Sequence, residues 1–139
     1  MANADDFLYE YAVVRYVPRV DREEFINIGL IMMCKRRRWL RGKIVLNGPR
    51  IEAFDPMADL FFLARQASIF ERDDVPDADL PVEERYRWLI AVKSAILQVS
   101  PSHPGCLPYT MPPDLHLNDS QADHFLTKEF NRLFSMLID

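Results

Sequence analysis

The stretch FINIGLIMMC, residues 25–34, contains only two positions, Asn27 and Gly29, that lack a large apolar side chain or a thiol. Runs of such side chains favour an extended strand. Because successive side chains of a strand point to opposite faces, both faces of this strand are apolar. A strand of this kind lies at the centre of a sheet that is covered on both sides, or whose second side is closed by a partner. The sequence therefore predicts a central strand with helical cover.

Two further strands are predicted to flank the central one. Leu8–Val17 is rich in Tyr and Val, and Trp39–Leu46 alternates between apolar and basic side chains. The connections between the three runs are short, and short connections join antiparallel neighbours, since a parallel pair needs a crossover of about a dozen residues or more. The first part of the chain therefore predicts an antiparallel meander.

The rest of the chain predicts about three helices. Asp55 followed by Pro56 is typical of a helix start, which predicts a helix from Pro56 to about Arg72. Its apolar side chains span more than one face, so we expect burial on two sides. A second helix is predicted from Pro81 to Pro101. Its stripe at three- and four-residue steps consists of Leu89, Val92, Ile96 and Val99.

A last helix is predicted to begin at Asn118 or Asp119, either of which can cap it. Its apolar stripe consists of Leu126, Phe130, Leu133 and Leu137. Between the helices, residues 71–79 read as an acidic loop and residues 101–118 as a proline-rich connection. Within that connection, Cys106–Thr110 can add a short edge strand to the sheet.

Together these elements predict a single α+β domain over residues 1–139. Its sheet is an antiparallel meander of three to four strands packed by about three helices. Residues 1–50 are mainly β and basic, with ten Lys and Arg against six Asp and Glu, or +4. Residues 51–139 are mainly helical and acidic, with seven against fifteen, or −8, and the whole chain carries −4. Such a division can mark a basic binding face on an acidic protein.

Composition and motifs also predict where the protein resides. Nearly half of the residues are apolar and about a quarter are charged, which is typical of a globular protein. The first six residues resemble no signal peptide, and no apolar run reaches the roughly 18 residues that a membrane span needs. Cys34 and Cys106 lie far apart, so we expect reduced, packed thiols rather than a disulfide. These features predict a cytoplasmic protein without a membrane partner.

Five polar residues around the start of the central strand form the first candidate site, for a ligand or a partner: Arg15, Arg19, Arg22, Glu24 and Asn27. An unsatisfied buried polar group costs about 1–3 kcal/mol, so an Asn within an apolar strand needs a hydrogen-bond partner. Guanidinium and amide donors gathered at a strand end can bind a carboxylate, a phosphate or a partner loop. Alternatively, Arg15 or Arg22 binds Glu24 and Asn27 as an internal clamp that fixes the first connection.

The basic residues around the second connection form an alternative site, for nucleic acid. They are Lys35, Arg36, Arg37, Arg38, Arg41 and Lys43, and Trp39 lies among them. A basic β-ribbon with one aromatic side chain can lie against a nucleic-acid backbone. The same composition is typical of a solvated turn that keeps edge strands from pairing with other chains.

The sequence contains no recognisable motif for catalysis, for a metal or for another cofactor. It has no Gly-x-Ser-x-Gly elbow, no glycine-rich phosphate loop and no kinase signature. Structural zinc sites use closely paired Cys and His residues, and this sequence has no such pairs. The set that comes nearest is His103, Cys106, His116 and His124. We therefore predict no catalytic residue, no metal site and no cofactor.

Two motifs in the first strands carry a family resemblance. They are Tyr11-Ala12-Val13-x-Arg15-Tyr16-x-Pro18 and Arg22-x-Glu24-Phe25-x-Asn27-x-Gly29, with Arg132-Leu133-Phe134 near the C-terminus. With them the sequence resembles the bacterial family catalogued as domain of unknown function 3037. The resemblance implies a small bacterial cytosolic protein whose relatives are often encoded beside HipA-like kinases, in a toxin–antitoxin context. It implies no activity and no established functional residues.

Three functions remain as hypotheses. The first is a non-catalytic interaction module that binds a HipA-like kinase or a second copy of the chain, because the helix around Leu60–Phe70 has a wider apolar surface than one face can bury. The second is a nucleic-acid-binding regulator that uses the basic hairpin 35–43. The third is a small enzyme with a site near Arg15, Glu24 and Asn27, which requires a cleft where these side chains converge.

Overall fold

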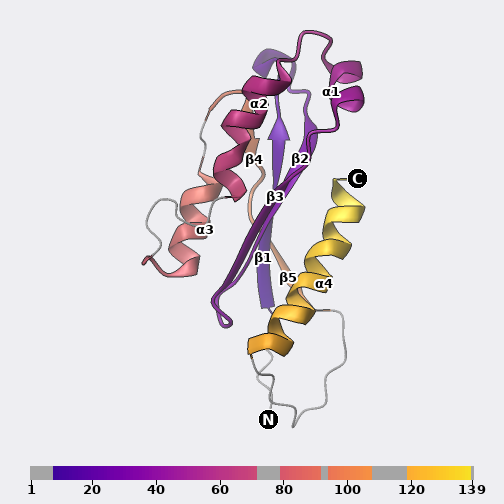
Figure 1. Cartoon of the computed structure of the whole chain (residues 1–139). Helices are drawn as coiled ribbons and strands as arrows, with labels where there is room; N and C mark the ends of the chain where they lie inside the picture. Colours follow the sequence, from indigo (N-terminus) through magenta and orange to yellow (C-terminus); the bar gives the residue numbers. More distant parts are fainter. Residues whose placement is uncertain (1–7, 72–78, 92–93, 108–118, 139) are drawn as a thin grey trace.

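The computed structural model describes residues 8–71, 79–91, 94–107 and 119–138, and it has an α+β fold (Figure 1). In chain order its elements are β1 (Leu8–Tyr16), η2 (Val20–Arg22), β2 (Ile26–Cys34), β3 (Trp39–Ile44), α1 (Gly48–Phe54), α2 (Leu60–Ala67), η3 (Ser68–Glu71), α3 (Val82–Ile90), β4 (Leu97–Val99), β5 (His103–Cys106) and α4 (Asp119–Leu137). The two η elements are 3-10 helices.

The strands form one antiparallel sheet in the order β3-β2-β1-β4, with β5 also paired to β1. The first three strands are the predicted meander. On its other edge β1 pairs with β4 along Val14–Tyr16 and with β5 along Leu8–Tyr11. In the described residues the sheet therefore has five strands and is accompanied by four α-helices, where the sequence predicted three to four strands and about three helices.

Both faces of β2 are covered, as its sequence predicts. Ile28 and Ile31 belong to a core with residues of α1, α2 and α3, including Ile51, Leu63 and Leu89. Leu30 and Met32 belong to a second core with Leu126, Phe130 and Leu133 of α4. In Figure 1, α2 and α3 lie on one side of the sheet and α4 on the other. Burial of apolar area on both faces is the main stabilising contribution to this three-layer arrangement.

The start of the helix predicted from Pro56 to Arg72 is wrong. Asp55 has extended backbone angles and ends α1, a short helix that the sequence analysis did not include. A proline disfavours helical angles in the residue before it, and the Asp55 side chain instead accepts a hydrogen bond from the Met57 N–H. The capping residue of α2 is Asp59, whose side chain accepts from the Phe62 N–H at 3.0 Å.

The helix predicted from Pro81 to Pro101 is also wrong, because α3 ends at Ile90. Leu97–Val99 instead forms β4 and pairs with β1. Leu97 and Val99 both face the core on the α3 side of the sheet, since residues two apart in a strand share a face. Of the predicted stripe, only Val99 lies in β4, and its apolar side chain suits a strand as well as a helix, so the stripe did not distinguish the two structures. Val92 lies outside the described residues.

The last elements follow the predictions more closely. The extra edge strand predicted at Cys106–Thr110 lies earlier, at His103–Cys106, and residues 108–110 lie outside the described range. Helix α4 begins at Asp119 as predicted, and its capping contacts also lie outside that range. Cys34 is buried, Cys106 is exposed rather than packed, and the two do not form a disulfide. None of the helices in the described segments is long and apolar enough to cross a membrane.

Candidate functional site

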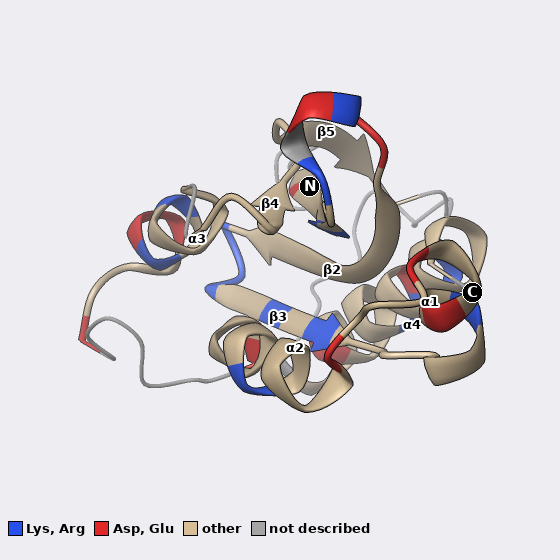
Figure 2. Cartoon of the chain, turned by 90° about the horizontal axis from the view of Figure 1, so that it is seen from above, with Lys and Arg blue, Asp and Glu red and all other residues tan. Residues whose placement is uncertain are grey.

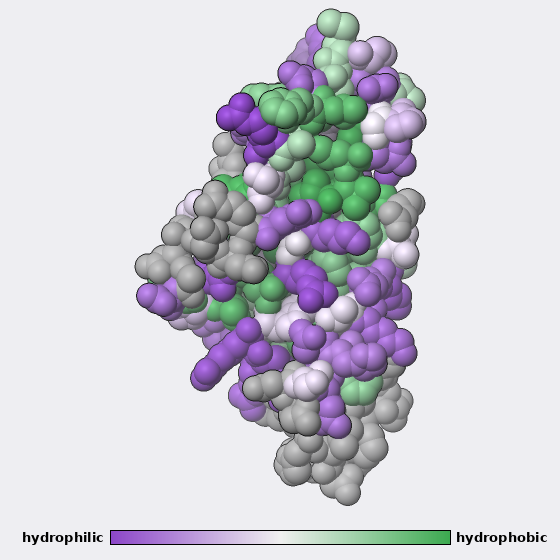
Figure 3. Space-filling model, viewed as in Figure 1, coloured by the Kyte–Doolittle hydropathy of each residue, from purple (hydrophilic) through white to green (hydrophobic). Residues whose placement is uncertain are grey.

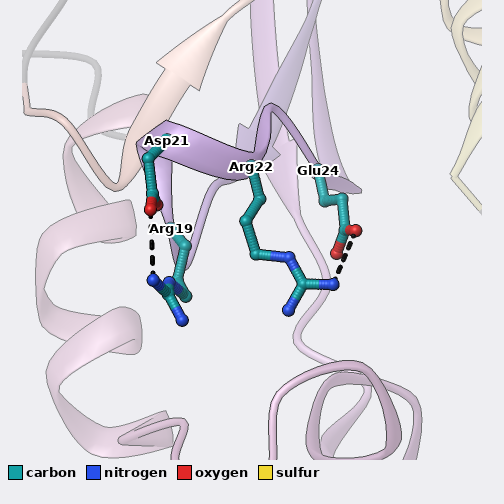
Figure 4. A network of polar contacts seen from close by, with 4 residues as sticks. All are labelled: Arg19, Asp21, Arg22 and Glu24. Carbon is teal, nitrogen blue, oxygen red and sulfur yellow. Dashed lines mark hydrogen bonds and ion pairs between the residues drawn. The ribbon is translucent and has the colours of Figure 1, made fainter.

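Three of the five residues of the first predicted site lie in surface ion pairs on the connection between β1 and β2. An Arg19 NH2 group donates to Asp21 and an Arg22 NH2 group to Glu24, each at 3.1 Å (Figure 4). All four side chains are exposed, and the hydrogen bond from Arg19 lowers the pKa of the Asp21 carboxyl. Exposed pairs of this kind contribute little to stability, at most about 1 kcal/mol.

The other two residues, Arg15 and Asn27, lie opposite each other on β1 and β2, beside a register shift at which β2 has one extra residue, Ile28. The Arg15 guanidinium lies 4.2 Å from the centre of the Phe25 ring. The Arg15 and Phe25 side chains border a cavity of about 270 Å³ that Glu23 and Gln98 also line. Glu24 and Asn27 do not line this cavity. The three side chains of the enzyme hypothesis thus do not converge in it, and Glu24 binds Arg22 instead.

Asn27 holds the end of α4 rather than the first connection. Its Nδ2 group donates to the Leu137 carbonyl at 3.2 Å, while its buried Oδ1 atom accepts no hydrogen bond from any described residue. Nearby, Arg50 Nη1 donates to the Ile138 carbonyl at 2.7 Å. The last carbonyls of a helix lack partners within the helix. Two side-chain donors from β2 and α1 therefore fix this helix end.

Replacing Asn27 with Leu should lower the free energy of unfolding by about 1 kcal/mol, the net value of one hydrogen bond. The loss is small because the change also removes the buried, unsatisfied Oδ1 atom. The structural effect should be local, with faster amide exchange in the last turn of α4, around Phe134–Ile138. Urea unfolding and hydrogen exchange measure the two effects, and Arg22→Ala is the control. A larger effect of Arg22→Ala would support the original clamp instead.

The six basic residues predicted to bind nucleic acid divide into four at the turn, of which Arg37 is half-buried, and two on β3. Lys35, Arg36 and Arg38 are exposed at the turn, where Arg38 has a left-handed backbone (φ 51°). Arg41 and Lys43 lie on β3 and contact α4. Arg41 donates to the Thr127 hydroxyl at 3.3 Å, and Lys43 Nζ lies 4.7 Å from the centre of the Phe134 ring. The second group therefore supports the packing of α4, and these residues do not form one ribbon surface.

A buried carboxylate that was not predicted from the sequence lies on α4, Glu129. Glu129 is 0% exposed, and it accepts hydrogen bonds from the Tyr9 hydroxyl at 2.5 Å and from Arg132 at 2.6 and 3.1 Å. Burial, with the hydrogen bond to Glu129 as the second cause, raises the pKa of Tyr9. The hydrogen bond to Glu129 also raises the pKa of Arg132. Since the carboxylate is enclosed and satisfied, its role is to join α4 to β1.

The hydroxyls of two further tyrosines form hydrogen bonds on the other face of the sheet. The Tyr16 hydroxyl donates to Asp55 at 2.5 Å, and the Tyr86 hydroxyl lies 2.7 Å from that of Ser102. Burial, followed by the hydrogen bond to Asp55, raises the pKa of Tyr16 to about 12. Burial also raises the pKa of Tyr86 to about 12.

The free energy of unfolding should therefore fall as the pH rises from 10 to about 12. A tyrosine whose pKa is raised in the folded protein holds its proton more tightly there than in the unfolded chain. Its contribution is complete below pH 10, the ordinary pKa, and is lost as the pH passes the folded value. Urea unfolding below, at and above pH 10 measures this slope. Tyr16→Phe should flatten it, and an unchanged slope would contradict a protected hydroxyl at this position.

The open edge of β3 borders a cleft with a volume of about 610 Å³. This β3 cleft is lined by residues 40–44, by Phe70 and Glu71 of η3, by Arg85 and Leu89 of α3, and by Phe130 and Asn131 of α4. It thus lies between the two helical layers. Figure 2 shows β3 at the outer side of the sheet, with bands of basic residues along it.

An apolar surface adjoins the cleft at α2. Met57, Phe61 and Phe62 are 89%, 76% and 45% exposed. A shallow, mainly apolar groove beside α2 is lined by Ile44, Leu46, Ala64, Ala67, Ser68 and Glu71. We call the three exposed side chains and this groove the α2 apolar surface. The expectation that the helix is buried on two sides is therefore wrong for the isolated chain, since Leu63 and Ala67 face the core while Phe61 faces outward.

Metal binding finds no support in the described residues, where no group of three or more His, Cys, Asp or Glu side chains could hold an ion. His103 and Cys106 lie on β5 and His124 on α4, while His116 is outside the described range.

The comparisons with known proteins agree with the resemblance in the first strands. The model of a family described as "Protein of unknown function (DUF3037)" matches residues 11–111, which span β1 to β5. Helix α4, with Arg132-Leu133-Phe134, lies outside the matched range. No curated protein and no solved structure is detectably similar to the chain. Because the match covers well over half of its 139 residues, the chain belongs to the DUF3037 family.

Proposed function

We propose that this chain is a non-catalytic interaction module of the bacterial cytoplasm that binds a protein partner through the α2 apolar surface. The exposure of Phe61 beside an apolar groove carries the proposal. Contiguous exposed apolar side chains on a small domain usually mark an interface, and aromatic residues and Met are enriched at interfaces. Figure 3 shows an apolar area in the upper part of the molecule, with a hydrophilic area below it on the same face.

The proposed partner is a HipA-like kinase encoded beside the gene for this chain, as the family resemblance implies. Co-expression of the two proteins followed by affinity purification tests the proposal. The complex should survive purification at micromolar concentrations and should be lost when Phe61 and Phe62 are both replaced with Ser. Such a loss is expected because a few buried aromatic side chains carry most of the binding energy at an interface.

The matched control is Met136→Ser, which removes another exposed apolar side chain, 62% exposed on α4. It should leave the complex intact. Light scattering on the isolated chain tests for self-association through the same surface. If no complex forms, or if the Phe61 and Phe62 double variant binds as well as the native chain, the proposal is wrong.

A nucleic-acid-binding regulator is the second candidate, and the exposed side chains of Lys35, Arg36 and Arg38 at one turn support it. Binding through these residues would weaken steeply with added salt, because neutralised phosphates release counterions. Titration of DNA at two salt concentrations tests this candidate. Replacing Arg36, Arg37 and Arg38 with Ser should then abolish binding, and binding that neither change affects would exclude the hairpin tip.

A further inference from the structure

We infer that the open edge of β3 binds an extended, acidic segment of the partner, which adds to the sheet as a further antiparallel strand. The inference rests on the proposed function and specifies how the partner is bound. The added strand lies in the β3 cleft, and an adjoining part of the same partner contacts the α2 apolar surface. Addition of a peptide strand to a free sheet edge is a recurrent mode of peptide recognition.

The backbone of β3 has free hydrogen-bonding groups along this edge. Val45 N–H donates to the Ile28 carbonyl at 2.8 Å, so the backbone groups of Val45 point toward β2. Because inward and outward groups alternate along an antiparallel strand, those of Leu40, Gly42 and Ile44 point away from β2. Ile44 N–H confirms the direction, since it donates outward to the Glu71 carboxylate at 2.5 Å.

The next two outward positions remain available for pairing. Among the described residues, no hydrogen bond occupies the outward N–H groups of Leu40 and Gly42. Native proteins usually cover, shorten or charge such an edge, because it can pair with other chains. Here Glu71 binds the edge at Ile44, and the Phe70 backbone lies against Gly42 on the α3 face of the strand rather than along its edge. Leu40 and Gly42 together offer two donors and two acceptors to an added strand.

The β3 cleft lies where an added strand would have to lie. Such a strand would lie about 4.8 Å from β3, in the plane of the sheet, with its side chains directed alternately toward the two helical layers. On one side they would meet Leu89 and Phe70, and on the other Phe130 and Asn131. The cleft lies between these layers, so it has space for the backbone and for both rows of side chains.

The charges on β3 select the chemistry of the added strand. Arg41 and Lys43 lie on its α4 side and contact the aromatic rings there, and neither forms an ion pair with a described carboxylate. The Glu71 carboxylate is already bound by the Ile44 N–H. Acidic side chains on the α4 side of the added strand would therefore meet two cations. Apolar side chains on its other side would meet Leu40 and Leu89.

The cleft and the α2 apolar surface form one continuous face. Ile44 and Glu71 line both the β3 cleft and the groove beside α2. A partner strand that runs along β3 past Ile44 would therefore reach the groove directly. One partner segment can in this way use main-chain hydrogen bonds at Gly42 and apolar contacts at Phe61.

A synthetic peptide of alternating Val and Glu, blocked at both ends, tests the inference in a nuclear magnetic resonance titration of the full chain. The amide signals of Leu40 and Gly42 should shift and become protected from exchange. N-methylation of two central peptide amides should abolish binding, because it removes the main-chain donors. A Val and Lys peptide should bind at least roughly tenfold more weakly, since it places like charges together.

The matched protein variants are Lys43→Glu and Lys35→Glu, which make the same charge change at two exposed positions of one hairpin. Lys43→Glu should weaken binding of the acidic peptide roughly tenfold, and Lys35→Glu should leave it unchanged. Thermal melting of both variants confirms that they fold. The N-methylated peptide provides a test that leaves the protein unaltered.

The outcomes separate the inference from the proposed function. If the acidic peptide does not bind at millimolar concentrations, or if N-methylation or Lys43→Glu has no effect, strand addition at β3 is overturned. The proposed function would still hold if the kinase complex forms and is lost on replacement of Phe61 and Phe62. If that complex does not form, the proposed function fails even when the peptide binds.

Discussion

Replacing Glu129 with Ala should lower the free energy of unfolding by about 2–4 kcal/mol. Two costs add. The Tyr9 hydroxyl, 120 residues away in the sequence, loses its acceptor in a buried environment. The truncated side chain also leaves a cavity between α4 and the sheet, because the Glu129 position is 0% exposed. Arg132 contributes little to the loss, since its side chain is 49% exposed and can be solvated by water. Urea unfolding followed by circular dichroism measures the effect.

Glu84→Ala is the matched control, because Glu84 is an exposed glutamate on a helix. It should change the stability by less than about 1 kcal/mol. Tyr9→Phe should account for part of the Glu129→Ala effect, about 1–3 kcal/mol, and the double variant should cost less than the sum of the two. Equal effects of Glu129→Ala and Glu84→Ala would contradict the enclosed position of Glu129.

Replacing Gly42 with Ala should lower the free energy of unfolding by about 1–3 kcal/mol, and Val at this position should cost more. An added Cβ atom would lie 1.9 Å from the Phe70 carbonyl oxygen and 3.1 Å from its carbon. These atoms belong to the backbone of η3, which cannot rotate away as the end of a side chain can. The substitution therefore forces η3 away from β3 and disturbs the buried Phe70 ring. Thermal and urea unfolding measure the loss.

Gly48→Ala is the control for Gly42→Ala. Its added Cβ would lie 3.3 Å from Leu60 Cδ1, the end of a flexible side chain, at the start of α1. The stability should change by less than about 1 kcal/mol, because Leu60 can move and alanine favours a helix. If Gly42→Ala proved as mild as Gly48→Ala, the close crossing of η3 over β3 would be wrong.

The sheet was the most predictable part of this fold. The apolar run of residues 25–34 allows one interpretation, a strand covered on both faces, and the short connections on either side leave antiparallel pairing as the simplest arrangement. The helical half was less predictable. Both Asp55 and Asp59 can cap a helix, and only the contacts of the folded chain distinguish them. Val99 fits the predicted helix stripe and a strand equally well, and only its pairing with Val14 of β1 shows that it belongs to a strand.

The functional residues were harder to predict, since their roles depend on distant parts of the chain. Arg41 and Lys43 read as a basic surface, and only the position of α4 shows that they also contact Thr127 and Phe134. Glu129 has no signal in the sequence, because an Arg three residues later is typical of a solvated helix pair. Asn27 was correctly predicted to need a partner, but the partner is the Leu137 carbonyl rather than the first connection.

The pairing of β1 with strands from both ends of the sequence has a kinetic consequence. The β1–β2–β3 meander requires only local contacts, whereas Val14 pairs with Val99 and Leu8 with Cys106. Contacts between residues so far apart close large loops, which slows folding. We therefore expect the meander to form first, with both apolar faces and one edge of β1 exposed until β4, β5 and α4 dock. During that interval the chain is most prone to aggregation, so its yield on refolding should depend strongly on protein concentration.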